Sequence, residues 1–234
     1  MTVLLQPMQK LFYLIFDEAN SDSDRLRAAL IGEVIPVLRR SGAQEIGLFV
    51  SDEAVSAGKP TQQSDPPIRA ALSFFLADVE TREAAEAAIR PLAADLAGYR
   101  VRESRPIVHA RNEGRRMPGM MQLTCIAARP GIGMEEFHRI WHEDHLQVAV
   151  ETQATFGYVR NEIIHSITEG APERWAGIVE ESFPIEALED PMVFFDAKTS
   201  GELSDNLTRM VKSCQRFIDL ENLEVTFMSE YYFD

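Results

Sequence analysis

The same order of predicted strands and helices occurs twice along the chain, and this repetition constrains the fold more than any other feature. In the first half, apolar periodicity predicts strands at 10–16, 45–52, 68–78 and 99–110 and helices at 23–42 and 81–98. In the second half it predicts strands at 120–130, 157–168, 174–184 and 224–233 and helices at 134–152 and 204–223. Each half therefore has the order βαββαβ.

This order is typical of a ferredoxin-like unit, in which both helices cover one face of a four-stranded antiparallel sheet. The other face of each sheet stays bare, and two units in one chain can cover these faces by packing sheet to sheet. A basic, turn-like segment, RNEGRRMPG (111–119), separates the halves. We therefore expect an α+β protein of two tandem units, 1–113 and 114–234, that form a pseudo-dimeric α/β barrel.

Charge and cysteine content restrict the partners and the compartment. The net charge is −14 at pH 7, and residues 119–234 carry 21 of the 37 acidic side chains but only 8 of the 23 basic ones. Such a field repels nucleic-acid backbones and anionic membrane surfaces, so we expect neither as a partner. The two cysteines show no paired spacing, and the apolar stretch at 11–16 is too short for a signal sequence or a membrane span. A cytoplasmic protein is expected.

The segment HRIWHEDH (138–145) holds three of the five histidines and one of the two tryptophans. At about 100° per residue, His138, His142 and His145 share one narrow stripe of the predicted helix. Phe137 and Trp141 lie about 90° from that stripe, in positions that suit core residues. We expect the histidines to border the core and to face a cleft.

Two kinds of chemistry suit such histidines. Histidine titrates near neutral pH, and carboxylates in the same helical turns can orient a ring, which favours acid/base catalysis. One metal ion cannot bind all three rings, because His138 and His145 are about 10.5 Å apart along the helix axis. An adjacent pair with a distant ligand such as His165 stays an alternative. Each histidine can also be a hydrogen-bonded border residue without a catalytic role.

The strand after this helix supplies further candidates. Along GYVRNEIIH (157–165), Tyr158 and Arg160 lie on one face and Asn161 lies on the other. Either face can line the barrel. We therefore expect Tyr158 to enter a pocket together with either Arg160 or Asn161. The alternative is that the strand is half exposed and lines no pocket. The glycines before the helix lack the third glycine of a dinucleotide-binding loop, since Glu136 stands there, which argues against NAD and FAD.

The run GMEEFHRIWHEDHLQVAVE (133–151), followed by FGYVRNEIIHSIT, GIVEESFP and MSEYYF, resembles the EthD family of the dimeric α/β-barrel superfamily. In that family a helix after a strand carries a Phe-x-x-x-Trp-x-x-x-His pattern, matched here by Phe137, Trp141 and His145. The resemblance spans 120–233, which makes the first half a degenerate copy that closes the barrel. It implies that His142 and His145 line a pocket between helix and sheet.

The resemblance also implies an enzyme that decarboxylates, dehydrates or isomerises a hydrophobic, aromatic or polyketide-like small molecule without an obligatory cofactor or metal. His142 or His145 would move the proton. The substrate would be bound by Trp141, His138, Tyr158, Arg160 and Asn161. Two alternatives stay open: a non-catalytic protein that holds a hydrophobic ligand for a partner enzyme, and a haem- or metal-dependent enzyme, since dye-decolorising peroxidases and chlorite dismutases share the superfamily. Either a monomer or a homodimer is compatible with the sequence.

Overall fold

The computed structural model describes residues 8–234. Residues 1–7, the start of the first expected unit (1–113), lie outside the described part. The strands are β1 (Gln9–Phe16), β2 (Gln44–Val50), β3 (Ile68–Leu76), β4 (Asp95–Ile107), β5 (Met120–Ile126), β6 (Gly157–Ser166), β7 (Gly177–Phe183) and β8 (Glu224–Phe233). The main helices are α1 (Ser23–Ala29), α2 (Ile35–Arg40), α3 (Arg82–Ile89), α4 (Met134–Arg139), α5 (Leu146–Thr152), α6 (Pro191–Phe194) and α7 (Ser200–Cys214). Two π-helical segments, η1 (Leu30–Val34) and η5 (Ile140–His145), join α1 to α2 and α4 to α5.

The strands form one closed antiparallel barrel in the order β1-β3-β2-β8-β5-β7-β6-β4. Two pairings connect the halves of the chain: β2 pairs with β8, and β4 pairs with β6. The predicted α+β barrel is confirmed at this level. The two sheets that we expected to pack on each other are joined by hydrogen bonds along both edges, because the outer strands of each half find partners in the other.

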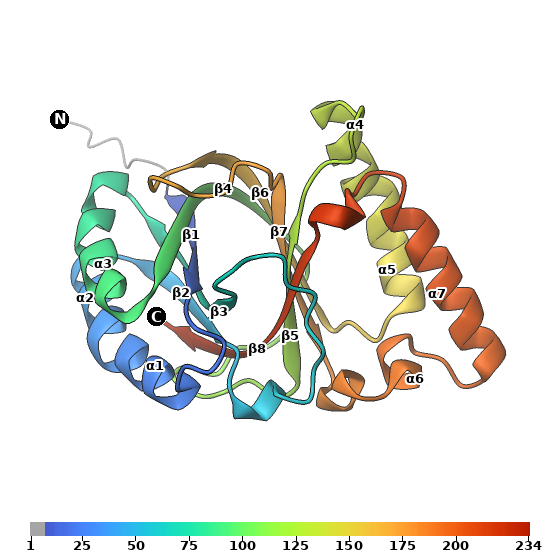
Figure 1. The fold of residues 1–234 in the computed structure, drawn as a ribbon, viewed down its shortest axis with the longest axis horizontal. Coiled ribbons are helices and arrows are strands. Elements are labelled where there is room, and N and C mark those ends of the chain that lie inside the picture. Colours follow the sequence, from blue (N-terminus) through green and yellow to red (C-terminus); the bar gives the residue numbers. More distant parts are fainter. Residues whose placement is uncertain (1–7) are drawn as a thin grey trace.

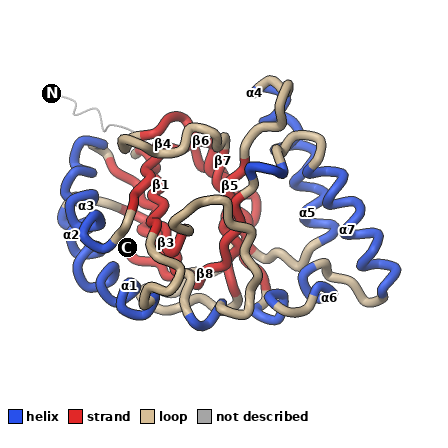
Figure 2. The backbone as a smooth tube through the Cα atoms, viewed as in Figure 1, coloured by secondary structure: helices blue, strands red, loops and turns tan. Residues whose placement is uncertain are grey.

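The helices lie outside the barrel on two opposite sides. Figure 1 shows α1, α2 and α3 over one side and α4, α5, α6 and α7 over the other, and the tube in Figure 2 shows the strands between these two helical layers. Within residues 8–234, every helix is too short or too polar to cross a bilayer. The barrel wall thus has two helix-covered outer faces, and these faces differ in packing.

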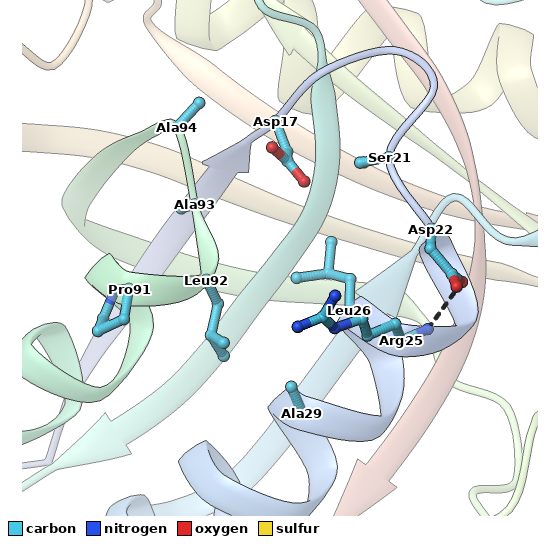
Figure 3. Close-up of a pocket in the computed structure, with 10 residues that line it drawn as sticks. All are labelled: Asp17, Ser21, Asp22, Arg25, Leu26, Ala29, Pro91, Leu92, Ala93 and Ala94. Atoms are coloured by element: carbon cyan, nitrogen blue, oxygen red, sulfur yellow. Dashed lines mark hydrogen bonds between the residues drawn. The ribbon is translucent and has the colours of Figure 1, made fainter.

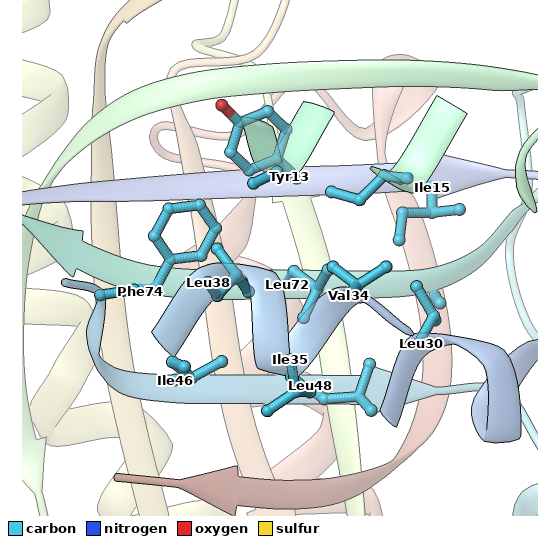
Figure 4. Close-up of a cluster of buried hydrophobic side chains, with 14 of the residues drawn as sticks. Tyr13, Ile15, Leu30, Val34, Ile35, Leu38, Ile46, Leu48, Leu72 and Phe74 are labelled. Atoms are coloured by element: carbon cyan, nitrogen blue, oxygen red, sulfur yellow. The ribbon is translucent and has the colours of Figure 1, made fainter. Parts of the chain in front are cut away.

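The first-half layer is filled with side chains. Leu30, Val34 and Leu38 on the α1–η1–α2 run are fully buried against the sheet. Figure 4 shows them over apolar residues of β1, β2 and β3 that include Tyr13, Ile46, Leu48, Leu72 and Phe74. Burial of a leucine or valine side chain contributes about 1.5 to 3 kcal/mol to folding. This layer is a core of the protein.

The ends of two predicted helices are wrong. The helix expected at 204–223 is α7, which begins at Ser200 and ends at Cys214. The helix expected at 81–98 ends early: α3 stops at Ile89, a 3-10 turn (Arg90–Leu92) follows, and β4 begins at Asp95. Pro91 lies in that turn, where a proline cannot donate the hydrogen bond that a longer helix needs. Ala97 pairs with Leu14 of β1, so four residues assigned to the helix belong to a strand.

Candidate functional site

The second-half layer is hollow. A cavity of about 230 Å³ lies between the outer face of the sheet, the π-helical segment η5 and the helices α6 and α7. Apolar side chains of α6, α7 and the segment after α7 form most of its wall, among them Phe195, Met210 and Phe217. The corresponding space in the first half is occupied by the side chains in Figure 4. An apolar enclosure with a few polar groups is the usual form of a small-molecule site.

The π-helical segment η5 sets which side chains reach this cavity. A π-helix has hydrogen bonds from residue i to i+5, so each residue turns by less than the about 100° of an α-helix. The predicted single stripe of three histidines is therefore wrong. His138 and His142 lie together, with ring centroids 5.7 Å apart, whereas His145 is displaced around the axis and lines the cavity.

His145, the last residue of η5, is buried against helix α7. Its Nδ1 lies 2.9 Å from the Ser213 hydroxyl, and its ring packs on Phe217 at a centroid distance of 4.9 Å. Burial, with a smaller contribution from Arg216, lowers the pKa of His145 to about 4. The ring is therefore neutral at physiological pH.

Trp141 is fully buried and forms one wall of the cavity. Its indole nitrogen donates a hydrogen bond of 3.3 Å to the hydroxyl of Tyr158, which also lines the cavity. The ring lies on Gly177 of β7, where a Cβ atom would come within 2.4 Å of the indole. Only glycine at this position lets the tryptophan approach the sheet so closely. The expected packing role of Trp141 and its place in the pocket wall thus coexist.

Glu181 of β7 is a polar cavity residue that the sequence analysis missed. Its side chain is 8% exposed, and among residues 8–234 its Oε1 atom has no hydrogen-bond partner. Burial raises the pKa of Glu181 to about 8, so the carboxyl group is mostly protonated at neutral pH. Cys214 also lines the cavity, and burial raises its pKa to about 12, which leaves the thiol protonated and unsuited to nucleophilic attack.

His138 and His142 face a different environment from His145. They line an open hollow with Glu135, Arg139 and other polar residues of the same helical run. Nε2 of His142 lies 3.2 Å from Glu162, and the backbone carbonyl of His142 accepts a bond of 3.3 Å from Arg160. Burial, followed by the charge of Arg160, lowers the pKa of His142. Arg160 is thus part of the support under this helix.

Asn161 points to the barrel interior, opposite Tyr158. Its amide nitrogen donates to the Ile178 carbonyl at 3.1 Å and to Glu180 at 2.8 Å. Glu180 also pairs with the ammonium group of Lys10 at 3.2 Å. Of the predicted substrate-binding residues, the structure therefore brings Trp141 and Tyr158 to the cavity with His145, and places His138, Arg160 and Asn161 elsewhere.

Two further features of the described chain bear on cofactors and ligands. No group of three or more His, Cys, Asp or Glu side chains within 8–234 is arranged to hold a metal ion, and His165 is exposed on β6. A second hollow, of about 410 Å³, lies at the start of α1 beside residues 91–94 (Figure 3). Most of its rim is exposed or half-buried, and its carboxylate Asp22 already caps α1 by accepting from Arg25 N at 3.0 Å.

Comparisons with known proteins identify the fold. No family model and no curated protein matches the sequence. Among solved structures, an anthrone oxidase-like protein aligns with a TM-score of 0.57 at 8% identity, covering 96% of this chain and 93% of its own. A candidate monooxygenase from Fusobacterium nucleatum aligns with a TM-score of 0.52 at 12% identity, and the alignment covers 99% of this chain and 94% of that protein. A candidate monooxygenase from Lactobacillus acidophilus aligns with a TM-score of 0.50 at 9% identity, and the alignment covers 97% of this chain and 96% of that protein. The chain shares the dimeric α/β-barrel fold with these proteins.

Proposed function

We propose that the protein is a small-molecule enzyme of the EthD type, which carries out proton-transfer chemistry on a hydrophobic substrate in the cavity between the second-half sheet, the segment η5 and helix α7. The observation that carries this proposal is the contrast between the two helix-covered layers. One is filled with aliphatic side chains, and the other encloses about 230 Å³ beside two titratable groups with displaced pKa values. Such groups concentrate at catalytic sites.

The proton-transfer role falls to His145. Its ring is neutral and buried, it is held by Ser213, and it lines a largely apolar cavity. A buried neutral imidazole of this kind can take a proton from a bound substrate and return it to another atom. Of the two histidines nominated from the sequence, His142 lies outside the cavity lining and would support the helix through Glu162 and Arg160.

The cavity suggests the size and character of the substrate. Its volume is about one and a half times that of a cavity of about 150 Å³ that takes up benzene, so a molecule with one or two rings would fit. Three exposed apolar side chains, Leu207, Val211 and Leu220, also line the cavity and would form its apolar mouth. A longer polyketide-like substrate would extend through this mouth to the surface.

The proposal includes two finer features of the chain. The strand order is β4-β1-β3-β2 in the first half and, in the same direction around the barrel, β8-β5-β7-β6 in the second. This repeated order supports a division into two ferredoxin-like units, 1–113 and 114–234, of which the second holds the site. The free cysteines Cys125 and Cys214 suit a reducing compartment, and we propose the cytoplasm. The anthrone oxidase-like and monooxygenase neighbours add oxidation of a ring substrate to the reactions worth testing.

A panel of one- and two-ring acids, alcohols, ketones and anthrone should be incubated with the protein, with detection of CO₂, water loss, isomerisation and O₂ uptake. For any reaction found, we expect His145→Gln to lower kcat by about 10²- to 10⁴-fold and His142→Gln to leave it within about twofold. Equal losses in the two variants would contradict the assignment of His145.

The second candidate function is a non-catalytic carrier of a hydrophobic ligand, favoured by the largely apolar wall of the cavity. Its sign would be tight binding of a panel compound with no turnover and with an affinity that His145→Gln does not change. Binding measurements on the same variants therefore separate the two functions.

A further inference from the structure

We propose that Glu181, together with Tyr158 and Gln122 beside it on the sheet, forms a subsite that receives a carbonyl oxygen of the ligand, with the Glu181 carboxyl group as hydrogen-bond donor. The ligand class is therefore a cyclic or aromatic carbonyl compound. This inference rests on the function proposed above and specifies which end of the molecule enters the cavity first.

The sheet register places the three side chains in one row. Glu181 of β7 is directly opposite Tyr158 of β6 on one side and Gln122 of β5 on the other. Directly opposite residues of antiparallel strands have Cβ atoms about 4.5 to 5.5 Å apart and project from the same face. All three residues line the cavity, so they form a polar strip on its otherwise apolar floor.

The Glu181 carboxyl group has no partner among the residues that the structure describes. No lysine, arginine or histidine of 8–234 forms an ion pair with it, and its Oε1 atom is buried without a hydrogen bond. A charged carboxylate in such a place is costly, and the group lowers that cost by keeping its proton. The raised pKa of about 8 agrees with this geometry.

The neighbouring residue on the same strand shows the opposite arrangement. Glu180 faces the barrel interior, where Lys10 and Asn161 satisfy its carboxylate. A structural glutamate in this protein is thus supplied with a cation and an amide. Glu181 has neither, which leaves its donor and acceptor atoms free for a ligand.

The flanking groups fit a ligand oxygen. The Tyr158 hydroxyl accepts its hydrogen bond from Trp141, so its own hydrogen is available for a further acceptor. The Gln122 amide nitrogen donates to Thr124, two residues further along β5, at 3.3 Å, which holds this side chain along its own strand at the end of the row. Two donors directed at one oxygen in a desolvated site would also stabilise negative charge that develops on that oxygen during proton removal from the adjacent carbon.

The test compares acetophenone with α-methylstyrene, which has the same shape but a methylene group in place of the carbonyl oxygen. Calorimetric titration at pH 6 and pH 9.5 gives the ratio of their affinities. We expect acetophenone to bind about tenfold more tightly at pH 6. This preference should fall several-fold at pH 9.5, because the ionised carboxylate no longer donates and the Tyr158 hydroxyl is the donor that is left.

Three variants make the result specific. Glu181→Gln keeps a neutral donor and should retain the preference at both pH values, and Glu181→Leu should show the reduced preference at both. Glu180→Gln, the same change on the opposite face, should behave as the wild type. A wild-type preference that does not change with pH, or one that keeps its full pH 6 value in Glu181→Leu, overturns the subsite while leaving the cavity as a binding site. Failure of both compounds to bind overturns the subsite and the proposed function together.

Discussion

Trp141 donates a hydrogen bond from its indole nitrogen to the Tyr158 hydroxyl across 3.3 Å, and this bond joins the π-helical segment to the sheet beneath it. Both side chains are buried, and both line the cavity. The contact therefore fixes the distance between the floor of the site and one of its walls. It also directs the remaining hydrogen of the tyrosine away from the tryptophan.

Truncation of this wall should be costly. We expect Trp141→Ala to lower the free energy of unfolding by about 3 to 5 kcal/mol, because a fully buried indole is removed. In a double-mutant cycle, Trp141→Phe and Tyr158→Phe should show a coupling of about 0.5 to 1.5 kcal/mol from the lost hydrogen bond. Chemical denaturation measures both quantities, and strictly additive effects of the two conservative changes would show that the bond contributes nothing.

Acid should destabilise the protein through His145. The folded-state pKa of about 4 lies below the unfolded value of 6.5, so the unfolded chain binds the proton first as the pH falls. Stability should therefore decrease between pH 6.5 and pH 4, by about 3 kcal/mol from this group. Urea denaturation across this range should give a shallower slope for His145→Gln than for wild type. Replacement of the exposed His165 by Gln is the matched control, and an equal change of slope there would contradict the assignment.

Alkali should destabilise the protein through Glu181. Its folded-state pKa of about 8 lies above the ordinary value of 4.5, so the folded chain holds the proton more tightly. This contribution is fully present below pH 4.5 and is lost as the pH rises through 8, with a cost of about 3 to 5 kcal/mol. Glu181→Gln should remove the loss, so its stability relative to wild type should increase from pH 5 to pH 9. A constant difference between the two proteins would show that the carboxyl group is not buried as described.

The filled and hollow layers should respond differently to the same substitution. Leu38 is fully buried in the first-half core, whereas Leu207 is 45% exposed at the cavity. We expect Leu38→Ala to cost about 3 to 5 kcal/mol and Leu207→Ala less than about 1 kcal/mol. Binding of a hydrophobic ligand should show the reverse order of sensitivity. Equal stability losses would mean that the second layer is packed as tightly as the first.

The order of strands and helices could be predicted from the sequence because each element carries its own apolar period. The end of α3 could not, since the residues after Pro91 suit a helix or a strand by composition, and pairing of Ala97 with Leu14 decides the outcome. Long-range partners of this kind are absent from a local pattern. The same limit explains why only the barrel, and not the exact way in which its halves join, could be anticipated.

The lining of the cavity could be predicted in part. The Trp141 and His145 positions could be found from a helical motif, but the grouping of His145 with two other histidines assumed α-helical turns throughout, and η5 breaks that assumption. Glu181 could not be identified from the sequence, because it follows another glutamate and strand alternation does not show which of the two carboxylates has a cation beside it. In the structure that cation is Lys10, which lies 170 residues before Glu180 in the chain.

Closure of the barrel has a consequence for the behaviour of the protein in a crowded solution. Each of the eight described strands has a hydrogen-bonded neighbour on both sides, so the folded chain offers no open backbone edge on which another chain could grow as an added strand. Separation of the chain at 113/114 would break the β2–β8 and β4–β6 seams and expose four such edges at once. Fragments of this protein should therefore aggregate or reassociate, and fragment complementation would report directly on the strength of the two seams.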